Sequence, residues 1–213
     1  MYLVNPLNKK ICTLIASTWL GAGALVASPL LPASVLTLSQ ESEPVGATLL
    51  QSSSVPFTAP TFSGTLLSQV WTGDTANPLG GLTFTFQIGN DLISPDAIDR
   101  VTLGGYSRFA VDASYDLPGI LTTSVTRSAS GNQVSFNFAG PFQGTLVQGG
   151  TSAILILQTD ALAWQPGLAA IINSSSVNVP TFAPALAVPE PSLTAMVLVG
   201  GALLGAFRFR KMD

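Results

Sequence analysis

The sequence predicts an all-β protein whose middle part folds as an antiparallel β-sandwich of about eight to nine strands. Apolar and polar residues alternate in the runs 82–88 and 134–138, which is the pattern of strands with one buried face. Glycine pairs such as Gly80-Gly81 mark turns between the runs. Only 94–99 and 161–168 have the pattern of a helical turn, and we expect Asp96 to cap the first of them.

The expected strands follow each other closely along the chain. The run 63–71 alternates in the same way as 82–88. The run 153–157 is apolar on both faces, which predicts a strand at the centre of a sheet. The complete set of predicted strands is 63–71, 82–88, 100–103, 120–127, 134–138, 144–147, 153–157 and 176–179.

Changes in composition divide the chain into five expected segments. Ser, Thr and Pro are frequent just before the first predicted strand, and Pro and Ala are frequent after the last one. We expect a signal peptide with a signal helix over 1–34, an extended lead-in over 35–60 and the β-sandwich domain over 61–180. A Pro/Ala linker is expected over 181–188, before a C-terminal sorting segment with a transmembrane helix over 189–213.

The N-terminal segment is typical of a secretory signal peptide. Lys9 and Lys10 precede an apolar stretch over 11–27. Small residues at positions 22 and 24 favour cleavage after Ala24, and a later cut near Ala33 or Ser34 is a second solution. The alternative is an uncleaved N-terminal anchor, and either form would export the middle of the chain.

The C-terminal segment has three parts in a fixed order. Pro189-Glu190-Pro191 is followed by an apolar stretch over 193–207 and then by the basic residues Arg208, Arg210 and Lys211. At roughly 1.5 Å per residue the apolar stretch makes a helix of about 22 Å, which is short for a bilayer core of roughly 30 Å. Snorkelling of the basic side chains narrows this gap, and their positive charge keeps that end in the cytoplasm. The alternative is a plain C-terminal membrane anchor.

This tail resembles the PEP-CTERM sorting signal of Gram-negative bacteria that make extracellular polysaccharide. The resemblance covers about 26 of the 213 residues. It implies that an exosortase, an integral-membrane transpeptidase-like enzyme, recognises Pro189, Glu190 and Pro191 and removes the tail. The implied partners are the secretion translocon, the exosortase-like enzyme, the inner membrane as a transient site and, as a further candidate, exopolysaccharide. The implied final location is the cell surface or the extracellular matrix.

The composition excludes several kinds of chemistry. Histidine is absent and the one cysteine, Cys12, lies in the signal segment, which leaves no Ser-His-Asp triad, disulfide or thiolate metal site. Acidic residues outnumber basic ones between positions 45 and 187, which argues against nucleic acid as a partner. We therefore predict a protein that is not an enzyme and that needs no cofactor.

Two small groups of residues are candidate binding sites. Asp91, Asp96 and Asp99 could supply oxygen ligands to Ca²⁺, although no EF-hand loop is present, and turn capping or solvation is the alternative. Tyr106, Tyr115 and Asp112 could stack on and hydrogen-bond a sugar ring, and ordinary edge-strand surface is the alternative. The sequence thus predicts an exported, non-enzymatic surface or matrix protein, with a carbohydrate-binding module as the alternative function.

Overall fold

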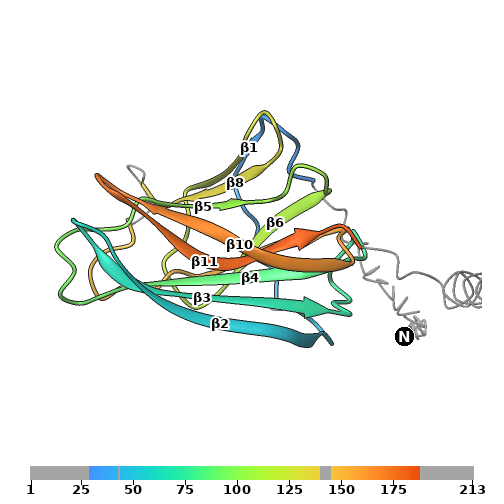
Figure 1. Cartoon of the computed structure of the whole chain (residues 1–213), viewed down its shortest axis with the longest axis horizontal. Helices are drawn as coiled ribbons and strands as arrows, with labels where there is room; N and C mark the ends of the chain where they lie inside the picture. The colour runs from blue at the N-terminus through green and yellow to red at the C-terminus, as the bar shows by residue number, and fades with distance from the viewer. Residues whose placement is uncertain (1–28, 43, 140–144, 188–213) are drawn as a thin grey trace, which may run out of the picture.

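The computed structural model of this protein describes residues 29–42, 44–139 and 145–187 (Figure 1). Within these residues the chain forms eleven strands in two antiparallel sheets, without any helix. The predicted all-β fold with two antiparallel sheets is therefore confirmed, but the described residues form eleven strands where about eight to nine were predicted. Residues 1–28 of the predicted signal segment and the predicted transmembrane helix lie outside the described residues, whereas residues 29–34 are described and form no helix.

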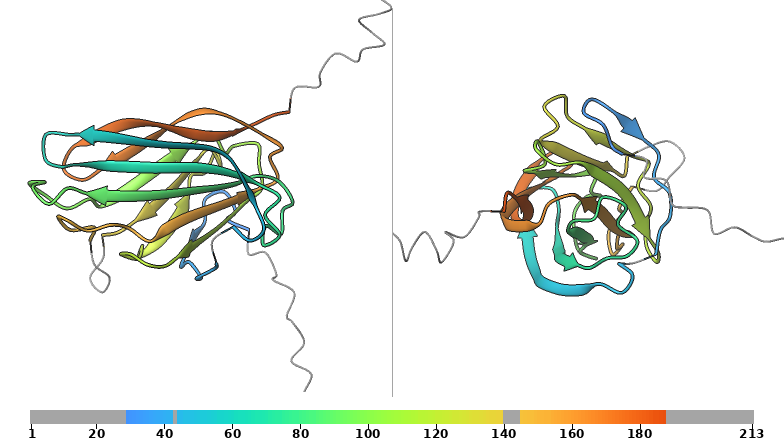
Figure 2. Two further views of the ribbon diagram at one scale, coloured as in Figure 1. Left: turned by 90° about the horizontal axis from the view of Figure 1, so that it is seen from below. Right: turned by 90° about the vertical axis from the view of Figure 1, so that its right-hand side faces the viewer.

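The strands are shared between a six-stranded and a five-stranded sheet. The first sheet contains, in spatial order, β1 (Val35–Leu36), β7 (Ser124–Arg127), β8 (Gln133–Asn137), β5 (Arg100–Gly104), β10 (Ala163–Ile172) and β11 (Ser176–Ala185). The second contains β2 (Thr48–Thr58), β3 (Ser63–Thr72), β4 (Thr83–Asn90), β9 (Ile154–Thr159) and β6 (Val111–Asp116). Figure 2 shows from the end how the two sheets curl around a common interior, with β2 and β11 close together along one side.

The core lies between the sheets and follows the predicted alternation. On β3, Leu66 and Val70 are fully buried and alternate with half-buried residues. Burial of each such side chain contributes about 1.5–3 kcal/mol. β9 is buried on both faces and lies between β4 and β6, as predicted for a central strand.

The two predicted helical turns are wrong. Residues 161–168 instead contribute to β10, because pairing with β11 along the whole strand outweighs local preference. Pro166 is tolerated there because β5 pairs only with Ala169–Ile172, so this part of β10 has one open edge. Residues 94–99 form bends and an isolated bridge between Ile98 and Leu146, so Asp96 caps no helix.

The folded unit extends beyond both predicted boundaries. Part of the predicted lead-in over 35–60 is strand β2, which pairs with β3 along its length and leaves its serines exposed or half-buried. Farther upstream, Leu30 is fully buried in the core. At the other side, β11 continues into the predicted linker, because Phe182 packs edge-to-face against Trp164 at 5.2 Å between ring centres.

Two other predicted strands are shorter than expected. Of 120–127, only Ser124–Arg127 is strand β7. Of 144–147, Leu146 makes a single bridge and residue 144 lies outside the described part of the chain. These segments are connections that touch the sheets at isolated points.

The N-terminal segment crosses from one sheet to the other and back. The Leu30 N–H donates to the Val111 carbonyl at 2.7 Å, at the start of β6. β1 then pairs with β7, after which Gln40 forms a parallel bridge with Tyr115 on β6. This segment therefore closes the side of the sandwich where β1 and β6 are the edge strands.

Candidate functional site

The three aspartates proposed for Ca²⁺ lie on the connection between β4 and β5 and are not gathered around one point. Asp91 accepts a hydrogen bond from the Ser63 hydroxyl at 2.7 Å, and Asp96 accepts one from the Ala97 N–H at 2.8 Å. Within residues 29–42, 44–139 and 145–187, no group of three or more acidic, histidine or cysteine side chains is arranged to hold a metal ion. The structure thus assigns Asp91 and Asp96 to local hydrogen bonding.

Asp74 is a buried carboxylate that accepts hydrogen bonds on both oxygens. One oxygen accepts the N–H groups of Val45 and Ala76 at 3.1 and 3.0 Å. The other accepts the Thr83 hydroxyl at 2.7 Å and the Gln158 amide at 3.4 Å. Asp74 thereby ties the start of β4 to β9, which is a structural role.

Two of the residues proposed to contact a sugar are buried. Tyr106 has an exposed fraction of 0%, its ring packs edge-to-face on Phe84, and burial raises the pKa of its hydroxyl. Asp112 is also buried, and one of its oxygens accepts the Ala113 N–H at 2.9 Å. Tyr115 is half-buried on β6. The prediction of Tyr106 as a sugar contact is therefore wrong, because no face of its ring reaches the surface.

A buried guanidinium is the feature that the sequence did not indicate. Arg127 has an exposed fraction of 6%. It donates to four backbone carbonyl oxygens at 2.8–3.0 Å, those of Leu30, Tyr106, Phe109 and Gly131. Burial lowers the pKa of the Arg127 guanidinium, and attraction by Asp160 partly offsets this effect. Arg127 therefore joins the N-terminal segment to the loop that follows β5.

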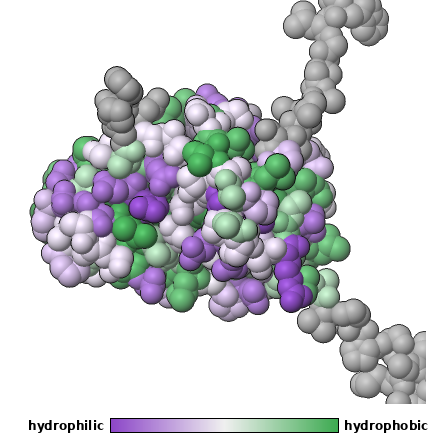
Figure 3. Space-filling model, turned by 90° about the horizontal axis from the view of Figure 1, so that it is seen from above, coloured by the Kyte–Doolittle hydropathy of each residue, from purple (hydrophilic) through white to green (hydrophobic). Residues whose placement is uncertain are grey.

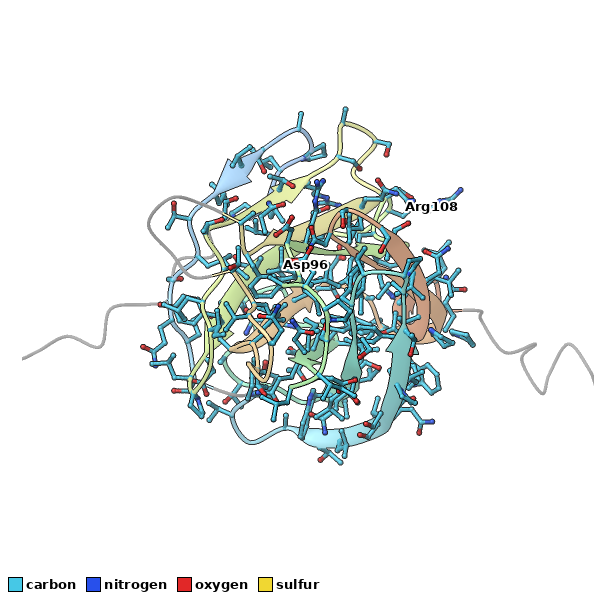
Figure 4. The ribbon with its side chains drawn as sticks, turned by 90° about the vertical axis from the view of Figure 1, so that its left-hand side faces the viewer. Asp96 and Arg108 are labelled. Atoms are coloured by element: carbon cyan, nitrogen blue, oxygen red, sulfur yellow. The ribbon has the colours of Figure 1, made fainter. Side chains whose placement is uncertain are left out.

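That loop also borders a hollow near the first and last described residues. The hollow has a volume of about 510 Å³, and its walls include Phe109, Pro184 and Leu186, with Arg108 and Gln165 as polar members. Arg108 is exposed, and Figure 4 shows it extending away from the sandwich, well apart from Asp96.

A second, more apolar groove of about 540 Å³ adjoins this hollow, because Gly105 and Gln165 line both. The groove depends on missing side chains. A Cβ on Gly105 would lie 2.9 Å from the Ala183 Cβ, and one on Gly167 would lie 2.8 Å from the same atom. Figure 3 shows that apolar side chains on the face seen from above are interrupted by polar ones. This face is therefore not one continuous apolar surface.

The residues of the predicted sorting signal, Pro189, Glu190, Pro191, Arg208, Arg210 and Lys211, lie outside the described residues. The described strands and loops include no helix long and apolar enough to cross a bilayer. The fold defines an all-β protein with two antiparallel sheets. No family model, no curated protein and no solved structure matches the chain.

Proposed function

We propose that this chain is an exported, non-enzymatic protein of the cell surface or extracellular matrix that is sorted and trimmed through its C-terminal tail. The observation that carries the proposal is the order of three features: Pro189-Glu190-Pro191, an apolar stretch over 193–207, and a terminal cluster of arginine and lysine. Each feature has a physical role in a membrane-bound sorting intermediate.

The extent of the fold supports this proposal. The described core runs from Leu30 to Phe182, so it overlaps the predicted signal segment only at its last residues and ends before the predicted sorting segment. Removal of the tail would therefore leave the described core uncut. A signal-peptide cut near Ala33 or Ser34 would remove the buried Leu30, so we propose that the cut falls before Leu30, with Ala24 as the site.

Both flanking segments begin at the same end of the sandwich. The Leu30 carbonyl shares the Arg127 guanidinium with the Phe109 carbonyl, and Leu186 lines the same hollow as Phe109. A membrane segment attached after Leu186 would hold this end toward the bilayer. The connections at the opposite end would then face the surroundings of the cell.

The sorting motif also lies close to the sandwich in sequence. β11 ends at Ala185, and only residues 186–188 separate it from Pro189. The two prolines disfavour helical conformations for the residues that precede them, which keeps Glu190 extended. An exosortase-like enzyme could therefore bind the backbone around Glu190 in an accessible form.

The test is the intact mass of the native protein recovered from surface and medium fractions. We expect loss of about the first 24 residues and of the tail beyond about Pro189, as a signal peptide and a sorting signal require. Glu190→Ala should retain the tail, and Ser192→Ala in the same tail is the matched control that should be trimmed normally. A native mass that still contains 193–213, or normal trimming of Glu190→Ala, would overturn the proposed sorting.

A further inference from the structure

Two large aliphatic side chains are exposed at one end of the sandwich, and the first and last described residues lie at the other end. Leu92 is 81% exposed and Ile93 is 89% exposed. They occupy the middle of a turn that is closed by a hydrogen bond from the Ser94 N–H to the Asp91 carbonyl at 3.1 Å. Such positions usually hold Gly, Pro, Asn or Asp, so neither residue is explained by the turn itself.

This turn, residues 91–94, is fixed to the rest of the fold. The Ser63 N–H donates to the Ser94 hydroxyl at 3.1 Å, and the Ser63 hydroxyl donates to Asp91. The Gly149 N–H donates to the Asp91 carbonyl at 3.3 Å, and a Cβ at Gly149 would lie 3.1 Å from the Leu92 Cδ1. A surface that is already ordered loses little conformational entropy on binding, which favours recognition.

The charges around the turn are mainly negative. Asp91 and Asp96 are exposed and Asp99 is half-exposed, while Arg100 is the one exposed base nearby in the described chain. A partner for the turn should therefore combine an apolar recess with positive charge.

The hollow at the other end of the molecule has these properties. Phe109, Pro184 and Leu186 give it apolar walls, and its volume of about 510 Å³ accommodates two aliphatic side chains. Arg108 is exposed beside it, whereas the nearby Asp160 accepts the Ala110 N–H at 2.9 Å. The turn and the hollow thus each combine apolar side chains with an exposed charge, negative at Asp96 and positive at Arg108.

We propose that copies of this protein associate head to tail, with Leu92 and Ile93 of one copy in the hollow of the next and Asp96 facing Arg108. β5 runs between the two surfaces: the turn precedes Arg100 and the hollow begins at Gly105 (Figures 1 and 4). A contact between two different surfaces at opposite ends adds copies head to tail, and it gives an open chain of molecules unless successive rotations close it into a ring. The inference rests on the fold and does not depend on sorting.

The first test uses disulfide trapping in the full chain. Cys12, the one native cysteine, is replaced by Ser. Pro95→Cys, beside Asp96, and Ser107→Cys, beside Arg108, are introduced together, so that Leu92 and Ile93 are kept. After mild oxidation of lysed cells, a head-to-tail contact should give a ladder of dimers, trimers and larger species on a non-reducing gel, because each copy offers both thiols. Each single cysteine variant should remain monomeric, and the two single variants produced together should give dimers only.

Other outcomes would overturn the proposal. Dimers of the Pro95→Cys variant alone would show that the turns meet each other, and a double variant that stays monomeric would show that the copies do not associate in this way. Both positions are exposed, so neither substitution threatens the fold.

The second test exchanges charges in the same double-cysteine chain. Arg108→Asp or Asp96→Arg alone should reduce the ladder by about threefold to tenfold, since attraction is replaced by repulsion, and the two together should restore it. Arg100→Asp is the matched control and should not reduce the ladder, because this arginine lies on the turn side. An unchanged ladder in Arg108→Asp, or no restoration in the double exchange, would contradict the proposed orientation.

Discussion

Replacement of Arg127 by Met should destabilise the sandwich strongly, because four backbone carbonyl groups share this guanidinium. Methionine fills a similar volume but supplies no hydrogen-bond donor. The carbonyls of Leu30, Phe109 and Gly131 would lose the donor that the structure gives them, whereas the Tyr106 carbonyl would keep the Phe109 N–H at 3.2 Å. The substitution therefore leaves buried acceptors without partners.

The expected magnitude follows from these acceptors. Each unsatisfied buried polar group costs about 1–3 kcal/mol, so the buried carbonyls of Leu30 and Gly131 together cost about 2–6 kcal/mol, and the part-buried Phe109 carbonyl adds a smaller amount. Removal of the buried charge returns part of this energy, since burial disfavours the charged guanidinium. We expect a net loss of about 3–5 kcal/mol, which is a large part of the 5–15 kcal/mol that is typical of a folded domain.

Urea unfolding of the segment 29–187, followed by circular dichroism, measures this loss as a lower midpoint at an unchanged m-value. Arg127→Lys should be intermediate, because an ammonium has three donors and lacks the planar fork. Arg108→Met, at an exposed arginine, is the control and should change stability by less than about 0.5 kcal/mol. The reasoning is refuted if Arg127→Met and Arg108→Met have the same midpoint.

Four further predictions concern the same fold. Tyr106→Phe should raise stability by about 1 kcal/mol in thermal unfolding, because the buried hydroxyl has no hydrogen-bond partner among the described residues; a loss would reveal a partner. Gly105→Ala should lower the melting temperature, since its φ is 100° and its Cβ would meet Ala183, whereas Gly104→Ala, with open space around it, should not. Leu30→Ala should cost about 2–5 kcal/mol in urea unfolding, and an unchanged midpoint would mean that Leu30 is not part of the core. Burial, with repulsion from Asp112 and Asp74, raises the pKa of Glu41, so the folded state should lose stability as the pH rises through that pKa. Glu41→Gln should remove this part of the pH dependence of stability. A pH profile identical to that of the wild type would refute the assignment.

The sequence predicted best those strands whose core face is mainly apolar. In β3, β4 and β8, apolar residues recur at every second position of that face, with Ser68 of β3 as an exception, so the pattern is visible without any knowledge of the partners. The sequence did not predict strand β6, because its buried positions include Asp112 and Ser114, which are typical of a polar turn. β10 was missed because Pro166 and Gly167 normally interrupt regular structure.

The features of the candidate site depend on contacts between distant segments, which a sequence pattern does not contain. The four acceptors of Arg127 come from three separate parts of the chain, so this residue looks like an ordinary surface charge in the sequence. Tyr106 directly follows Gly105, whose φ is positive, and the Tyr106 ring lies in the core. Neither orientation can be deduced from the neighbouring residues alone.

The order in which the strands pair has a kinetic consequence. β4 pairs with β9 and β5 pairs with β10, so that Thr83 lies opposite Gln158 and Leu103 opposite Ala169. The long stretch of chain between each pair of residues must close into a loop before the contact forms. Folding is therefore slow compared with that of a protein built from local contacts. Because β9 and β10 are synthesised long after β4 and β5, the chain would remain unfolded for longer during synthesis. Such a delay would suit a protein that crosses a membrane through a translocon before it folds.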